Sequence, residues 1–139
     1  MNDWTQITIK LFTATLLGGL LGLNRELTGK YGGFKTNAIV ALASSSFVIL
    51  TSIFEPSEVP RVITGVIQGV GFIGGGLIFK ENRTTRGLTG AAEIWLSSAL
   101  GLACGVGLWP LAVLSLIFAL IVLIGGKFLF NKLKNRENR

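Results

Sequence analysis

The chain has 139 residues, of which 50% are hydrophobic and 14% are charged, and its mean hydropathy is +0.62. This length predicts one domain, and this composition favours an integral membrane protein over a soluble globular one. With no histidine and one cysteine, the sequence excludes an internal disulfide, a histidine-centred acid–base catalyst and a Cys/His zinc cluster. No catalytic residues and no cofactor are therefore expected. The net charge of +6 does not indicate nucleic acid, because the basic residues lie between and after the apolar runs.

The first expected membrane helix covers residues 7–23, with Lys10 near its start, where a long side chain can reach the membrane interface. No basic segment and no small-residue cleavage site of a signal peptide precedes this helix, so it should remain in the mature protein. Gly18 and Gly22 are four residues apart and predict a packing face near the end of the helix.

The second expected helix covers residues 36–54 and contains three consecutive serines, Ser44 to Ser46. Their hydroxyls are expected to bond back to carbonyls of the preceding turn, and ion coordination is the alternative. The connection at residues 55–61 holds two prolines, two acids and one cation, so it breaks the helix. It is expected on the opposite side of the membrane from the basic loop that precedes this helix.

A glycine-rich apolar run at residues 62–79 predicts the third helix, with about the length that crosses a bilayer. Three glycines fall on one side of this helix, with Gln68 on their flank, so the run predicts the central packing surface of the bundle. These glycines are Gly65, Gly69 and Gly76. Residues 69–74 also match G-x-G-x-x-G, but the apolar sequence continues through them without the strand and helix start that dinucleotide binding requires.

The rest of the chain predicts two more helices, at residues 88–108 and 111–130, separated by a break at Trp109-Pro110. A short basic tail at residues 127–139 is expected to end the chain without a soluble C-terminal domain. If the N-terminus lies outside, eleven cations face the cytoplasm against two outside, Lys10 and Arg61. The cytoplasmic set is Arg25, Lys30, Lys35, Lys80, Arg83, Arg86, Lys127, Lys132, Lys134, Arg136 and Arg139. The predicted fold is an all-α polytopic membrane bundle of five transmembrane helices, with the N-terminus out and the C-terminus in.

Glu93 is the sharpest polar signal, because it lies about 7 Å inside the start of the fourth helix. Its i+4 series is a ridge of small residues, so the carboxylate is expected on the packed face of the helix. That ridge comprises Ser97, Gly101 and Gly105. An ion or proton site is one hypothesis, and a salt bridge is favoured because it needs no ion pathway. The candidate partners are Arg25, Lys35 and Arg86.

Five blocks of sequence, in order over nearly the whole chain, match a known family. They are GGLLGLNRE at residues 18–26, GFKTNAIV at 33–40, Arg61 followed by GVGFIGGGLIF at 69–79, RGLTGAA at 86–92 with Trp95, and GLACGVG at 101–107. On these blocks the chain resembles the transmembrane domain of the MgtC/SapB family of bacterial membrane proteins. Many members also carry a soluble C-terminal domain, which the basic tail here does not resemble.

The resemblance implies a multi-pass protein of the bacterial cytoplasmic (inner) membrane that is associated with adaptation to low magnesium. We expect a non-enzymatic regulator that acts through contacts with a membrane-protein partner. The alternatives are a divalent cation carrier, for magnesium or calcium, that uses Glu93, and a structural subunit of a larger membrane complex. The polar site candidates are Glu93, Arg25, Glu26, Asn37, Gln68 and Arg86, and whether any of them binds a metal is open. The small-residue faces also predict a homodimer or small homo-oligomer within the lipid bilayer.

Overall fold

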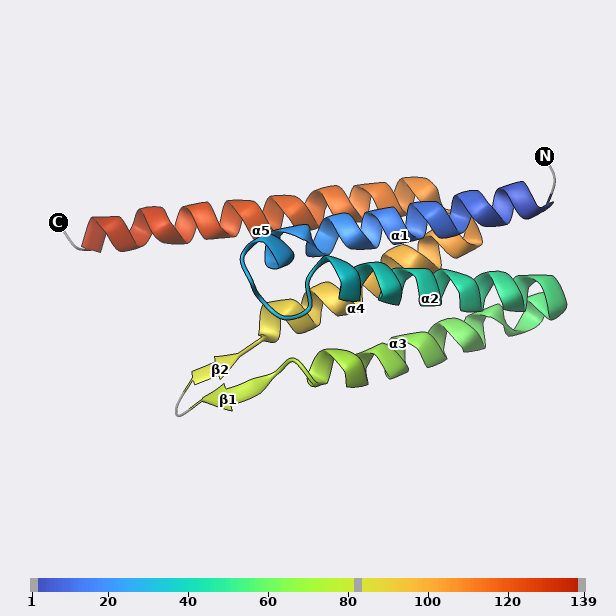
Figure 1. Cartoon of the computed structure of the whole chain (residues 1–139), viewed down its shortest axis with the longest axis horizontal. Coiled ribbons are helices and arrows are strands. Elements are labelled where there is room, and N and C mark those ends of the chain that lie inside the picture. The colour runs from blue at the N-terminus through green and yellow to red at the C-terminus, as the bar shows by residue number, and fades with distance from the viewer. Residues whose placement is uncertain (1–2, 82–83, 138–139) are drawn as a thin grey trace.

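The computed structural model describes residues 3–81 and 84–137 and is built almost entirely of helices that run back and forth along one direction (Figure 1). The elements are α1 (Asp3–Leu27), α2 (Phe34–Phe54), the 3-10 helix η1 (Pro56–Glu58), α3 (Val59–Gly75), β1 (Phe79–Glu81), β2 (Thr84–Arg86), α4 (Leu88–Val106) and α5 (Trp109–Glu137). The predicted all-α class and the five predicted helices are confirmed. The α1–α2 loop and the β1–β2 hairpin lie at one end of the bundle, and η1 and the α4–α5 turn lie at the other (Figure 1).

Four of the helices are long and apolar enough to cross a membrane, namely α1, α2, α4 and the part of α5 from Trp109 to Phe128. The third predicted span, residues 62–79, is wrong at its C-terminal end, because α3 stops at Gly75. Three consecutive glycines, Gly74 to Gly76, have low helix propensity, and the chain leaves the helix at the last of them and continues into β1, which pairs antiparallel with β2. At 17 residues, α3 is about 25 Å long, which is shorter than the hydrocarbon core of a typical bilayer.

Glycines in the left-handed conformation bound α4 at both ends, Gly87 with φ 88° and Gly107 with φ 89°. At the C-terminal end, Gly107 N donates to Cys104 O at 3.0 Å and Leu108 N donates to Ala103 O at 2.8 Å. These bonds satisfy the last carbonyls of the helix and reverse the chain into α5, as a glycine at this position allows. The chain therefore breaks at Gly107 and Leu108, just before the predicted break at Trp109-Pro110, and those last two residues begin α5.

The centre of the bundle is the mutual packing of α1, α2 and α4 around Ala41 of α2. A Cβ atom added at Gly18 of α1 would lie 2.6 Å from the Cβ of Ala41 and 2.7 Å from Asn37 O. A Cβ added at Gly101 of α4 would collide with the backbone of the same residue, Ala41. The absence of side chains at these two glycines thus lets three helix backbones meet closely.

The other two helices lie outside this centre, α5 against α4 and α1, and α3 against α4 and α2 (Figure 1). The prediction that the glycine-rich helix is the central packing surface is wrong. A Cβ added at Gly65 or Gly69 would meet nothing within 4 Å, and the buried residues of α3 are Val70 and Gly74. α3 therefore packs against the core through the face that carries Val70 and Gly74, and most of its glycines are exposed.

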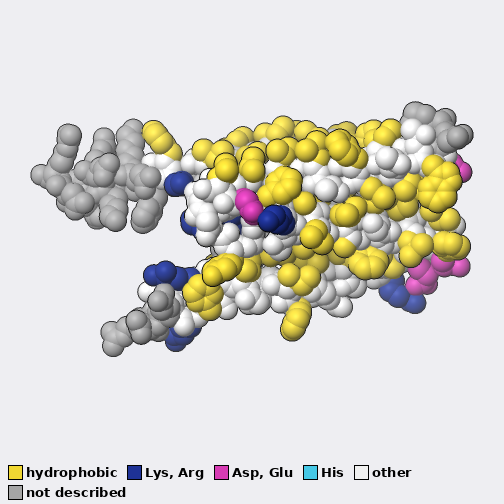
Figure 2. All heavy atoms as spheres, in the orientation of Figure 1, with side chains coloured by type: hydrophobic (Ala, Val, Ile, Leu, Met, Phe, Trp, Pro, Cys, Tyr) yellow, Lys and Arg dark blue, Asp and Glu magenta, His cyan; other side chains and the backbone are white. Residues whose placement is uncertain are grey.

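The outer surface is strongly apolar along the helices, and Figure 2 shows hydrophobic side chains over most of the length of this face. Phe12, Phe72 and Phe118 are 66%, 87% and 65% exposed. Contiguous exposed apolar surface of this kind is typical of helices that contact lipid. In the same view, most Lys and Arg side chains lie toward the hairpin end, in keeping with the charge pattern of the sequence (Figure 2).

Candidate functional site: a basic cavity at one end of the bundle

A cavity of about 750 Å³ lies at the hairpin end of the bundle, and we call it the basic cavity. Its walls come from the end of α1 and the α1–α2 loop, the segment after α3, the hairpin, the first turns of α4 and the middle of α5. The lining residues are Asn24, Arg25, Gly29, Lys30, Tyr31, Leu77, Phe79, Thr85, Arg86, Gly87, Leu88, Thr89, Gly90, Glu93, Leu123 and Lys127. Four cations and one carboxylate therefore face this cavity.

The carboxylate is Glu93, and it lies beside Arg25 from the last turn of α1. Arg25 Nη1 and Glu93 Oε1 are 3.5 Å apart, and the two side chains are 12% and 7% exposed. Arg25 Nε also donates to Tyr31 O at 3.0 Å, which holds the guanidinium against the α1–α2 loop. Of the three cations expected as partners of Glu93, the structure brings Arg25 into contact, while Arg86 lines the same cavity.

Gly90 makes room for this pair, a role that the sequence analysis missed. A Cβ added there would lie 2.5 Å from Arg25 Nη2 and 2.7 Å from Arg25 Cζ. The position is one turn before Glu93 on α4, so a side chain at residue 90 would push the guanidinium away from the carboxylate. In the sequence, the only indication of this role is that Gly90 lies three residues before Glu93. The spacing can be interpreted only when the position of the Arg25 side chain is known.

The pair leaves part of the carboxylate unsatisfied, since Glu93 Oε2 is buried and has no hydrogen-bond partner among the described residues. A buried carboxylate with one long contact depends on the charge of its neighbour more than on hydrogen-bond geometry. Arg25 is therefore the residue on which the ionised form of Glu93 depends.

Asn37 does not join the cavity, and it connects helices instead. Its Nδ2 donates to Gly32 O at 2.8 Å and to Gly33 O at 2.9 Å, and Ser97 Oγ of α4 donates to Asn37 Oδ1 at 2.8 Å. Both amide protons are used, and the residue is fully buried. Asn37 thus fixes the α1–α2 loop and α4 to the start of α2, a structural role.

The remaining polar candidates lie apart from the cavity. Gln68 is exposed on α3, and the side chain of Glu26 lies against Gly33 on the exposed end of α1. The predicted serine geometry is confirmed for Ser44, which donates to Val40 O at 2.8 Å, and for Ser46, which donates to Leu42 O at 2.9 Å. Ser45 differs, because its hydroxyl is buried without a partner among the described residues.

The predicted packing glycines divide into two groups by what surrounds them. Gly18, Gly22, Gly101 and Gly105 would each bring an added Cβ to 3.0 Å or less from a neighbouring helix or loop. Gly65 and Gly69 face open space, and an added Cβ at Gly76 meets only carbonyls at the end of its own helix. The first group explains how α1, α2 and α4 approach one another, and the second group takes no part in packing within the chain.

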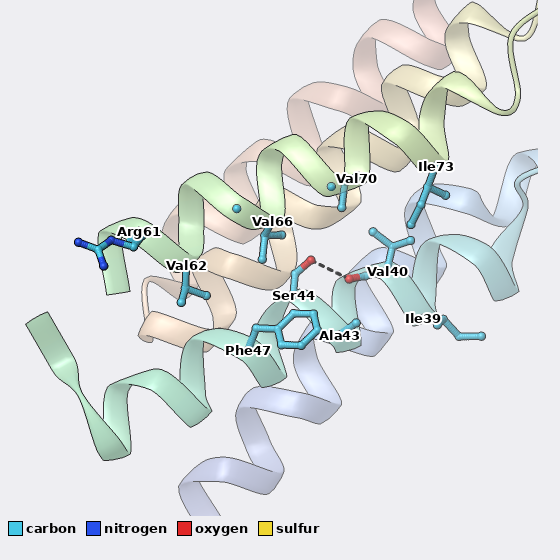
Figure 3. A pocket seen from close by; sticks show the side chains of 12 residues that line it. Ile39, Val40, Ala43, Ser44, Phe47, Arg61, Val62, Val66, Val70 and Ile73 are labelled. Carbon is cyan, nitrogen blue, oxygen red and sulfur yellow. Dashed lines mark hydrogen bonds between the residues drawn. The ribbon is translucent and has the colours of Figure 1, made fainter. Parts of the chain in front are cut away.

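A second hollow, an apolar groove of about 650 Å³, runs between α2 and α3 (Figure 3). Figure 3 shows Val62, Val66 and Phe47 along it, with the hydroxyl of Ser44 donating its proton to Val40 O. Arg61 lies at one end of the groove, and its Nη1 is 2.9 Å from Glu58 Oε2. The groove can accept an apolar group but presents no reactive chemistry.

No group of three or more His, Cys, Asp or Glu residues that could hold a metal ion occurs in residues 3–81 and 84–137. In the basic cavity, the single carboxylate is opposed by Arg25, Lys30, Arg86 and Lys127. Like charges raise the cost of bringing in a further cation at these separations. The electrostatics of the described cavity thus favour anions.

Taken together, the apolar helices and the charged cavity at one end define a multi-pass membrane protein. The sequence profile of the MgtC family matches residues 11–132, so the chain belongs to the MgtC family. This match confirms the resemblance that the five sequence blocks indicate.

Relatives at moderate identity include two proteins named MgtC and one named SrpB. Protein MgtC of Brucella abortus is 40% identical over 110 residues, which cover 78% of this chain and 46% of that protein. Protein SrpB of Synechococcus elongatus is 37% identical over 141 residues, covering 91% and 78%. Protein MgtC of Salmonella typhimurium is 31% identical over 131 residues, covering 94% and 55%. The chain spans about half the length of these MgtC relatives. No solved structure matches the chain.

The geometry of the pair predicts strong coupling between Arg25 and Glu93. Arg25→Gln should lower the free energy of unfolding by about 3–5 kcal/mol, because it strands a buried carboxylate. The double variant Arg25→Gln/Glu93→Gln should lose less than the sum of the two single variants. Thermal unfolding in one detergent measures the cycle.

The exposed pair Arg61 and Glu58 serves as the control, since the same substitutions there should cost under about 1 kcal/mol. Strictly additive losses for Arg25 and Glu93, or losses no larger than those of the exposed pair, would show that the buried pair does not exist.

Proposed function

We propose that this chain is a non-enzymatic membrane regulator that acts through contacts with other membrane proteins. The observation that carries this proposal is the state of the buried carboxylate: Glu93 is paired with Arg25 and surrounded by further cations. A divalent cation bound there would compete with the guanidinium for the carboxylate and would be repelled by the other cations of the cavity. That arrangement disfavours the alternative in which Glu93 carries magnesium or calcium.

Coordination chemistry gives the same result. Magnesium prefers near-octahedral oxygen ligands, and proteins usually supply one or two carboxylates with several waters retained. Asn37, one of the polar site candidates, uses both amide protons and one lone pair of its amide oxygen in bonds that hold the helices together. The amide oxygen of Asn37 is thus already engaged in a contact between helices, which weighs against its use as a magnesium ligand.

Membership of the MgtC family supports a role in adaptation to low magnesium in the inner membrane of a bacterium. The charge pattern supports the orientation with the N-terminus out and the C-terminus in. In that orientation the basic cavity would open at the cytoplasmic face.

The regulator and the carrier are separated by ion flux into liposomes that contain only this protein. We expect no saturable magnesium or calcium flux above empty liposomes, and co-purification of an unrelated membrane complex from the native membrane. Saturable flux that is lost in Glu93→Gln, with that variant still folded, would establish the carrier instead. Purification of the chain as a fixed-stoichiometry component of one complex would favour the structural subunit.

Reporter fusions test the orientation. A fusion after Arg139 should be active only in the cytoplasm, and a fusion within residues 55–60 only outside it. The reverse pattern would contradict both the orientation and the cytoplasmic placement of the basic cavity.

We also propose that two copies associate through the exposed glycines of α3. Gly65 and Gly69 are one turn apart and have open space around them, so they offer the flat surface that helix pairing in lipid uses. Gly69→Leu fits within one chain but should overfill a contact between two, weakening the dimer roughly tenfold or more.

Gly71→Leu is the matched control, because Gly71 is also exposed with nothing within 4 Å but does not line the groove between α2 and α3. Mass measurement in detergent should show loss of the dimer for Gly69→Leu alone. A monomeric parent protein, or equal effects of both variants, would remove α3 as the contact.

A further inference from the structure

We infer that the basic cavity binds a phosphate-bearing anion, either the headgroup of an anionic phospholipid or a soluble phosphate compound. This inference rests on the cavity alone and goes beyond the proposed regulatory role. Its volume of about 750 Å³ is within the range of small-molecule sites, which run from ~300 to ~1,000 Å³.

Charge is the first argument. Glu93 is matched by Arg25 at 3.5 Å, and Lys30, Arg86 and Lys127 line the same cavity without a second carboxylate among the described lining residues. These cations come from three separate places in the chain, the α1–α2 loop, the hairpin and α5. Figure 2 shows dark blue side chains on both sides of the recess beside the hairpin. Folding thus places three mutually repelling cations in one cavity. An anion bound between them would reduce this repulsion.

The N-terminus of α4 adds a second source of positive potential. Gly87 to Gly90 line the cavity, and no side chain of the described chain caps this helix. The first amides of a helix have no partner inside it, and the helix dipole favours an anion at this end. Phosphate groups commonly bind where such amides point into a site that also holds cations.

Apolar side chains complete the cavity. Leu77, Phe79 and Leu123 form part of its lining next to the cations. The cations would contact the phosphate group of a ligand, and these apolar side chains would contact its apolar portion, such as a glycerophospholipid chain or a nucleotide base. The shared requirement is the phosphate, and the two sources differ in what lies beyond it.

The test compares two double variants of the full-length protein, purified in detergent with bound lipid removed. Lys30→Gln/Lys127→Gln removes two cations from the cavity and leaves the Arg25–Glu93 pair intact. Lys35→Gln/Lys80→Gln removes two exposed cations at the same end that do not line the cavity. All four residues are on the surface, so both variants should keep the thermal stability of the parent.

Two probes are used: phosphatidylglycerol, with phosphatidylcholine as its comparison, measured by native mass spectrometry, and ATP without metal, measured by calorimetry. We expect saturable binding of phosphatidylglycerol or of ATP, weakened roughly tenfold or more in Lys30→Gln/Lys127→Gln and less than about threefold in Lys35→Gln/Lys80→Gln. Binding of phosphatidylglycerol alone identifies a lipid headgroup, and binding of ATP alone identifies a soluble source. Failure of both probes, or equal weakening in the two variants, would overturn the inference.

Discussion

The close approach of three helix backbones at Ala41 is the constraint on which the rest of this structure depends. Gly18 on α1 and Gly101 on α4 both lie against Ala41, and neither position has room for a methyl group. In a bilayer, burying apolar side chains between helices gives little hydrophobic free energy, because lipid tails are equally apolar. Close van der Waals contact therefore supplies much of the attraction between helices. The depth of α4 relative to α1 and α2 is fixed at this crossing.

That depth determines the polar contacts nearer the hairpin end. Glu93 lies two turns before Gly101 on α4 and contacts Arg25 of α1. Ser97 lies one turn before Gly101 and bonds to Asn37 of α2. A buried ion pair is weak evidence of stability, because desolvation offsets much of its attraction. Here it has a geometric consequence, since it joins α1 to the first turns of α4 and so shapes one wall of the basic cavity.

The helices could be predicted from the sequence because an apolar run long enough to cross a membrane itself indicates a helix. The observed limits of α2 and α4 lie within two residues of the predicted ones. The end of α3 could not. Apolar character continues from Phe72 to Phe79 on both sides of the last helical turn, and hydropathy does not separate a helix from a hairpin strand. The end of the helix at the last of three adjacent glycines depends on how the hairpin packs, which is tertiary information.

The candidate site divides in the same way. A carboxylate inside a membrane helix indicates a nearby cation, and the sequence narrowed the partner of Glu93 to three residues that include Arg25. The basic cavity itself could not be predicted, because Lys30 and Lys127 are almost a hundred residues apart in the chain. Glycines were misleading for a related reason: the same residue type permits contact at Gly101 and lies in open space at Gly69, and only the neighbours decide.

The most direct test of the account is the thermal stability of Gly101→Ala compared with Gly71→Ala in the same detergent. Both glycines lie within helices, where alanine is intrinsically better by about 0.8–1 kcal/mol, so propensity alone stabilises both variants. The account predicts that Gly71→Ala is as stable as the parent or more stable, and that Gly101→Ala loses about 1–3 kcal/mol because its methyl group meets the backbone of Ala41. Equal or greater stability of Gly101→Ala would contradict the claim that the bundle is built on this crossing.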